Sequence, residues 1–253
     1  MWSAGSSPRH CADVYLSRDE VATVGTDGAL WHRRCDSPAD GMDAVAVRLR
    51  ETHSPRSLRV WLSGSLCRPV RLAAIAGKLS RAERVRLWED TAATASGLAA
   101  PCRVMFDLRG DGGSAIAVVV EEATLKTIAD ATRSMRARAV SIRPWWAEAL
   151  ADALRSNAGL RAFAAWEGAA LTTLTSGRED FTSAQSMYPI DDLQAAMAAF
   201  ARGQVSAMVS SDEAVAVTLD WSSVAFDGPA RASGGGAGAA AFAAWTTPLG
   251  VQR

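Results

Sequence analysis

The sequence has no net charge, because 27 lysines and arginines are matched by 27 aspartates and glutamates. A neutral chain has no overall field to hold a polyanion, so the composition argues against nucleic acid as a partner. The sequence also lacks the uncharged apolar run of ~18 residues that a membrane helix needs, and its N-terminus, MWSAGSSPRH, lacks the apolar segment of a secretory signal. We therefore expect a cytoplasmic protein with no direct membrane insertion.

Metal and hydrolase chemistry are poorly supported too. A zinc site needs closely spaced ligands, and the four cysteines form no CxxC pair. The cysteines are Cys11, Cys35, Cys67 and Cys102. We expect reduced, partly buried thiols and no metal. The Ser63-Gly64-Ser65 stretch lacks the GxSxG of a nucleophile elbow. The three histidines all lie in the first quarter of the chain, and none has an evident partner for a catalytic triad with these serines.

What the sequence does contain is a repeated pattern of short β-prone runs. Residues 162–166, 169–175 and 180–187 are three such runs separated by turn signals, which is typical of a three-stranded meander. Residues 13–34 have the same layout, with an acidic turn at Asp19-Glu20 and a second turn around Asp27-Gly28. Two such units predict a duplicated α/β fold with a cleft between its halves.

Helices and strands alternate between and after the meanders. Apolar spacing predicts helices at 41–52, 121–135 and 145–155, and a capping box of Ser80 and Glu83 starts another that ends at Gly97. Its apolar side is expected to carry Val85, Leu87, Trp88, Ala92 and Ala95. Further β-prone runs predict strands at 58–63, 67–72, 102–108, 115–120 and 138–143. The second half is expected to continue with a helix at 192–202, strands at 205–209 and 214–219, a glycine-rich linker at 233–238 and a C-terminal helix at 239–245.

The order of these elements resembles a known family. Residues 59–65 (RVWLSGS) read as a strand ending in a Gly-Ser break, and residues 80–90 (SRAERVRLWED) as an acidic helix with an aromatic–Glu pair. A strand–helix–strand unit at 115–143 and a hairpin at 163–175 follow. This layout resembles the PilM family of actin-like proteins of type IV pilus assembly, which is related to the cytoplasmic half of GspL in type II secretion.

The resemblance implies a duplicated RNase H-like, actin-like α/β fold. Each of its two subdomains has a mixed sheet that starts with a three-stranded meander and is flanked by helices. The corresponding division is a loose N-terminus at 1–11, subdomain 1 at 12–156 with an inserted part at about 66–114, and subdomain 2 at 157–253 with the C-terminal helix. An unrelated α/β protein remains the weaker alternative.

The resemblance also implies a nucleotide site between two hairpins. Each hairpin should supply an Asp-Gly pair, whose acid coordinates Mg²⁺ through water and whose amides face the phosphates. Here the first hairpin is Ser17-Arg18-Asp19-Glu20, without glycine, and the second has Trp166 where the family's Asp is expected. The adenosine-contacting Gly-Gly is absent from residues 208–213.

We therefore expect degenerate nucleotide loops made of Arg18, Asp19, Glu167 and Gly168. In this interpretation the chain has no catalytic residue and no cofactor, and binding of ATP and Mg²⁺ has been lost. An active ATP-binding protein or ATPase of the same superfamily is the alternative.

The partner that the resemblance implies is an inner-membrane assembly protein with a short cytosolic tail. Such a tail binds in extended form at a sheet edge, with a few apolar anchors, and Pro69 marks residues 67–72 as an edge strand. The candidate partner-binding residues are Trp61, Cys67, Pro69, Val70 and Trp88, although the two tryptophans equally suit the core or a subdomain interface. We expect a structural adaptor, held at the inner membrane through its partner. The sequence does not indicate which pilus or secretion complex the protein serves, or whether it forms a homo-oligomer.

Overall fold

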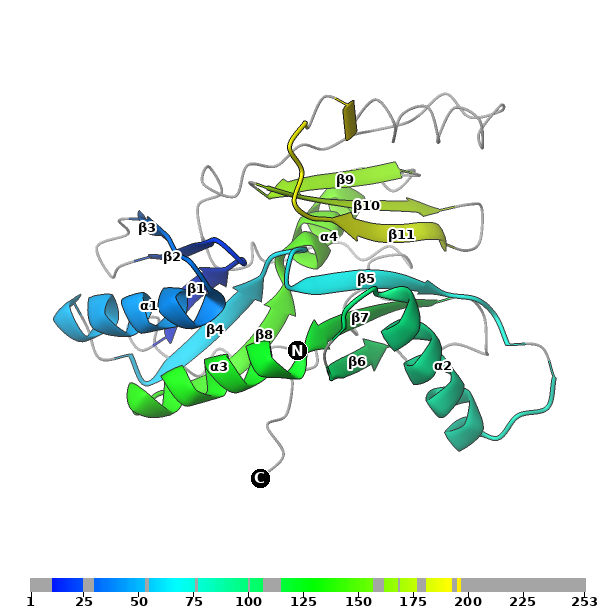
Figure 1. Ribbon diagram of the computed structural model, residues 1–253, viewed down its shortest axis with the longest axis horizontal. Coiled ribbons are helices and arrows are strands. Elements are labelled where there is room, and N and C mark those ends of the chain that lie inside the picture. The colour runs from blue at the N-terminus through cyan, green and yellow to red at the C-terminus, as the bar shows by residue number, and fades with distance from the viewer. Residues whose placement is uncertain are drawn as a thin grey trace.

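The computed structural model describes residues 11–24, 30–52, 55–75, 77–99, 101–106, 115–156, 162–167, 169–176, 181–192 and 195–196. Within these residues the chain forms three β-sheets, covered by four helices (Figure 1). Some predicted features lie outside the described part of the chain. They are Gly168, most of the expected segments 1–11 and 192–202, and every element expected beyond residue 202. None of the described helices is long and apolar enough to cross a membrane.

The largest sheet has five strands in the order β3-β2-β1-β4-β8. They are β1 (Cys11–Leu16), β2 (Glu20–Val24), β3 (Leu30–Arg34), β4 (Ser57–Leu62) and β8 (Arg138–Pro144). The first three form the predicted antiparallel meander, and β4 and β8 join it in parallel. Two helices, α1 (Pro38–Thr52) and α3 (Glu122–Ser134), lie next to each other on one face of this sheet (Figure 1).

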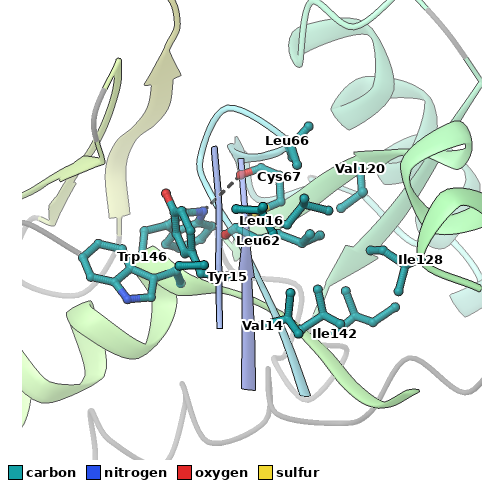
Figure 2. Packing of buried hydrophobic residues seen from close by; sticks show 14 of the residues in the cluster. Val14, Tyr15, Leu16, Leu62, Leu66, Cys67, Val120, Ile128, Ile142 and Trp146 are labelled. Carbon is teal, nitrogen blue, oxygen red and sulfur yellow. Dashed lines mark hydrogen bonds between the residues drawn. The ribbon is translucent and has the colours of Figure 1, made fainter. Parts of the chain in front are cut away.

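Alternation along the strands divides this sheet into an apolar face and a mixed face. Val14 and Leu16 are fully buried on the side of the helices, where they join Met42 of α1 and Ile128 of α3 in the main core. Figure 2 shows Tyr15 on the opposite side of the strands. Helix α1 begins at Pro38, earlier than the expected residue 41, because proline suits the first turn of a helix, where its missing N–H is not needed.

The second sheet has the order β5-β7-β6 and lies beside the first. Its strands are β5 (Cys67–Leu72), β6 (Cys102–Phe106) and β7 (Ala115–Glu121), and α2 (Arg81–Ala95) covers it. The capping box of Ser80 and Glu83 is confirmed, and so is the position of Pro69 on an outer strand. The predicted apolar side of α2 is wrong in part, because Leu87 is 46% exposed while Trp88 and Ala92 face the sheet.

The second predicted meander is the third sheet, in the order β11-β10-β9. Its strands are β9 (Ala162–Glu167), β10 (Ala170–Ser176) and β11 (Phe181–Met187), and α4 (Trp145–Ser156) precedes them. Trp146 is fully buried, and its indole N–H donates to the carbonyl of Cys67, 3.1 Å away (Figure 2). The Trp145 ring meets Tyr15 edge to face. Helix α4 therefore ties the third sheet to the other two.

Candidate functional site

The turn between β4 and β5 is the point where the three sheets meet. Ser63 donates its amide to the carbonyl of Leu16 at the end of β1, 2.9 Å away. Gly64 donates its amide to Glu167 on β9, and its carbonyl accepts the hydroxyl of Ser186 on β11. This turn, residues 63–65, therefore lies between the two hairpins that the resemblance assigns to phosphate binding.

Glu167 is the buried acid of this junction. Its side chain reaches Tyr15 and Gly64: the Tyr15 hydroxyl donates to Oε2 at 3.1 Å, and the Gly64 amide donates to Oε1 at 3.1 Å. Only 2% of the residue is exposed. Burial raises the pKa of Glu167 to about 7, because the charged form is poorly solvated, while hydrogen bonds from Gly64, Tyr15 and Ser63 act in the opposite direction.

The neighbours of Glu167 respond to the same burial. The pKa of Tyr15 is raised well above its ordinary value, first by burial and then by the negative charge of Glu167. The pKa of the Cys67 thiol is raised for the same two reasons in the same order. Both groups are therefore neutral near pH 7.

Gly64 leaves no space between the turn and the third sheet. A Cβ at this position would overlap Thr172 Oγ1 and would lie 2.7 Å from Ser186 Oγ. These two hydroxyls also bond each other at 3.1 Å. The backbone of the turn therefore packs directly on β10 and β11, and only glycine fits there.

The other two described residues of the predicted nucleotide loops are Arg18 and Asp19. Arg18 donates through Nε to the Ser65 carbonyl at 3.1 Å and forms an ion pair with Glu121 at 2.7 Å, at the end of β7. Asp19 accepts a hydrogen bond from the Ser17 hydroxyl within its own hairpin. The structure thus places Arg18 and Glu167 on the same 63–65 turn, whereas Asp19 stays in the β1–β2 turn.

A second feature is a groove between the outer strands β5 and β11. It is a cavity of about 330 Å³ lined by Arg68, Pro69, Val70 and Arg71 of β5, by Ala95 and Ser96 at the end of α2, and by Thr182, Ser183, Ala184, Gln185 and Ser186 of β11. We call it the β5–β11 groove. Two of the predicted partner-binding residues, Pro69 and Val70, lie in its wall.

The other three predicted partner-binding residues do not line this groove. Trp88 is buried in the small core under α2, and its indole N–H donates to the Ala73 carbonyl. Cys67 is fully buried, with its thiol 3.2 Å from the carbonyls of Leu62 and Ser63. Trp61 is half-buried and donates to Asp13 at 3.1 Å.

Arg68 and the β11 residues of the groove were missed by the sequence interpretation. No local pattern links two strands so far apart in sequence, and the polar alternation of residues 181–187 predicts only a half-exposed strand. Among the described residues no cluster of histidine, cysteine, aspartate and glutamate could hold a metal ion. All four cysteines are free, and two of them, Cys35 and Cys67, are buried.

Comparison with known proteins identifies solved structures with a similar fold. No protein-family model matches the sequence, and no curated protein matches it. Three similar solved structures are a Bacteroides thetaiotaomicron protein described as having an actin-like ATPase fold and unknown function, a PilM–PilN type IV pilus biogenesis complex, and the cytoplasmic domain of EpsL, an inner-membrane component of the type II secretion system of Vibrio cholerae.

The three matches differ mainly in the share of the other chain that they cover. The Bacteroides protein is 10% identical with a TM-score of 0.50, over 87% of this chain and 84% of that one. The PilM–PilN structure is 13% identical with a TM-score of 0.50, over 81% and 67%. The EpsL domain is 14% identical with a TM-score of 0.46, over 83% and 82%. The two matches with a TM-score of 0.50 confirm the prediction of a PilM-like, actin-like α/β fold, while the internal duplication stays a prediction.

Proposed function

We propose that this protein is a cytoplasmic adaptor of a type IV pilus or secretion-type assembly complex. In this role it binds the cytosolic tail of an inner-membrane protein and lies at the membrane only through that partner. A PilM-like fold supports the proposal, because a protein of that fold is found in complex with PilN. We propose the same division of the chain as the resemblance implies, with the inserted part supplying β5, α2 and β6.

The observation that carries the proposal is the buried carboxylate of Glu167 between the two hairpins. Both of its oxygens accept hydrogen bonds from the protein, and its partners Tyr15 and Gly64 belong to the opposite half. The turn of residues 63–65 packs directly on β10 and β11, so a triphosphate in the same place would need this turn to move away from them. This arrangement suits a structural contact between halves better than phosphate binding.

The tail would dock in the β5–β11 groove. Both walls are outer strands in the described topology, and they lie close to each other, so an extended segment would lie over them and contact their side chains through alternate residues. The wall offers apolar contact through Pro69, Val70 and Ala184 and hydrogen-bonding groups along β11. Cys67 and Trp88 are buried, and Trp61 lies on β4 of the first sheet, so these three residues would not touch the tail.

The proposal is tested with the proteins encoded beside this chain. Those with one transmembrane helix and a short cytosolic segment are co-expressed with it, and the purified complex is challenged with a synthetic peptide of that segment. We expect co-purification that the peptide abolishes. Failure of every such protein to co-purify would reject the adaptor function.

An ATP-binding protein is the second candidate, favoured by the likeness to a structure described as an actin-like ATPase fold. Calorimetry with Mg-ATP separates the two. The adaptor proposal expects no binding heat up to millimolar nucleotide. Binding that disappears in Asp19→Ala or Glu167→Gln would instead establish the second candidate.

A further inference from the structure

The β5–β11 groove has charge of one sign only. Its two charged wall residues, Arg68 and Arg71, are both cations on β5, and the other polar residues of the wall are serine, threonine and glutamine. Among the described residues of the wall there is no aspartate or glutamate. Although the whole chain is neutral, this groove is therefore locally positive.

Arg68 is a half-buried cation of this wall. Its Nη1 donates to the neutral carbonyl of Ser96 at 2.9 Å, while its buried Nε has no hydrogen-bond partner. It forms no ion pair with any residue that the structure describes. The nearby carboxylate of Glu121 is instead paired with Arg18 at 2.7 Å.

The surroundings of Arg68 agree with this geometry. Burial lowers the pKa of Arg68, the positive charge of Arg18 lowers it further, and Glu121 offsets the two only in part. A half-buried guanidinium without a carboxylate is unfavourable, and a planar carboxylate is the group that a guanidinium fork binds best. The Arg68 guanidinium is already partly removed from water in the folded protein. An incoming carboxylate would therefore gain an ion pair without a further cost of burying the arginine.

The groove is also elongated. Four consecutive residues of β5 and five consecutive residues of β11 form its long walls. Since an extended chain advances about 3.3 Å per residue, this length suits a segment of roughly four residues. A small anion would use the Arg68 end alone and would leave Pro69, Ala184 and the β11 hydroxyls without a role.

We propose that the β5–β11 groove binds an extended, acidic segment of a partner protein, with an aspartate or glutamate of that segment paired to Arg68. The inference rests on the proposed function, since the segment is the part of the partner that docks. It adds the chemistry of the tail: an acid flanked by small or apolar residues.

The experiment is a selection of random twelve-residue peptides displayed on phage, with the full-length protein as bait. We expect the selected peptides to be enriched in aspartate and glutamate and poor in lysine and arginine. Synthetic copies should bind at least about tenfold more weakly to Arg68→Gln, as for the loss of one charge-assisted hydrogen bond. Hydrogen exchange with bound peptide should show protection of β5 and β11.

Arg103→Gln is the matched control, because Arg103 is exposed on β6 and lies outside the groove. This variant should keep wild-type affinity, and thermal denaturation should show that both variants are folded. Selection that yields no binders, binders without acidic enrichment, or binding equal in Arg68→Gln and wild type would overturn the proposal. Inorganic phosphate that competes as well as the peptides would show that the site binds small anions instead.

The two proposals fail separately. If a membrane protein co-purifies but its tail still binds Arg68→Gln and protects other strands, the acidic-groove inference is wrong and the adaptor function stands. If acidic peptides bind the groove and no membrane protein co-purifies, the inference holds and the adaptor function is wrong.

Discussion

The hydroxyl of Tyr15 on β1 donates a hydrogen bond to the carboxylate of Glu167 on β9, 152 positions later in the sequence. The two residues belong to the two predicted meanders. Gly64 completes the contact from the β4–β5 turn. The hairpins that the family resemblance assigns to nucleotide are thus joined by a buried acid, and the behaviour of this acid can be measured.

The first prediction concerns pH and the Glu167 carboxyl. Burial raises its pKa in the folded protein from the ordinary 4.5 to about 7, so the folded state keeps a proton that the unfolded chain releases between these values. The contribution of this group to stability is therefore complete below about pH 4.5 and is lost as the pH rises to about 7. At about 1.4 kcal/mol per pH unit, the loss is ~3 kcal/mol.

Glu167→Gln removes the titration while keeping the size of the side chain. Urea denaturation between pH 4.5 and pH 8 should show that this variant becomes more stable relative to wild type as the pH rises. Glu89→Gln, at an exposed position on α2, is the control and should follow the wild-type curve. Parallel curves for Glu167→Gln and wild type would contradict the assignment.

The second prediction concerns the packing of the turn at Gly64. An added methyl group overlaps Thr172 Oγ1 and crowds Ser186 Oγ, so Gly64→Ala should destabilise the protein by about 2 kcal/mol. Thr172→Ala removes the atom in closest conflict, and the double variant should regain part of the loss. Chemical denaturation of the four proteins of this cycle gives the coupling free energy, and additive effects would show that the contact is absent.

Local sequence patterns were sufficient for the strands and most helix ends of the described part of the chain. The β9–β10 hairpin and the Ser80 cap depend on neighbours within a few residues, and both were predicted. The apolar face of α2 was predicted less well: the helix buries Trp88 and Ala92, one turn apart, and leaves Leu87 and Ala95 outside. Leu87 lies off the stripe that holds Trp88 and Ala92, and Ala95 is exposed in the last turn of the helix, so the helical period marks the buried face better than the full set of apolar residues does.

The candidate site was predicted as a list of residues but not as an arrangement. Glu167 was assigned to a turn because Gly168 follows it, and a turn acid is normally solvated. Its burial follows from Tyr15 and Gly64, which are distant in sequence and reach it only after the sheets assemble. The same holds for the groove, where Arg68 meets β11 through tertiary packing alone.

The third prediction concerns the start of α2. The Ser80 hydroxyl accepts the amide of Glu83, and the Glu83 carboxylate accepts the amide of Ser80. Ser80→Ala should cost about 1 kcal/mol and should speed hydrogen exchange at the Glu83 amide. Ser80→Asp keeps an acceptor at the cap and should preserve both values. Unchanged exchange at Glu83 in the alanine variant would show that the cap does not form in solution.

The fourth prediction concerns the ion pair on the mixed face of the first sheet. Asp13 accepts hydrogen bonds from Arg59 and from the indole of Trp61, and the side chains of Asp13 and Arg59 are 11% and 31% exposed. Asp13→Asn can keep the bond to Trp61 but leaves the guanidinium without its counter-charge. We expect a loss of about 2 to 3 kcal/mol, somewhat below the full cost of breaking a buried pair because Arg59 is partly solvated.

The double variant Asp13→Asn with Arg59→Met decides whether the loss comes from charge or from packing. Methionine keeps much of the arginine stem over the sheet and removes the unpaired cation, so the double variant should be more stable than Asp13→Asn alone. Urea denaturation at 0.1 M and 1 M salt adds a second criterion. Because both side chains are mostly buried, salt should change the difference between wild type and Asp13→Asn only slightly. A double variant no more stable than Asp13→Asn, or a difference that salt abolishes, would place the pair at the solvated surface instead.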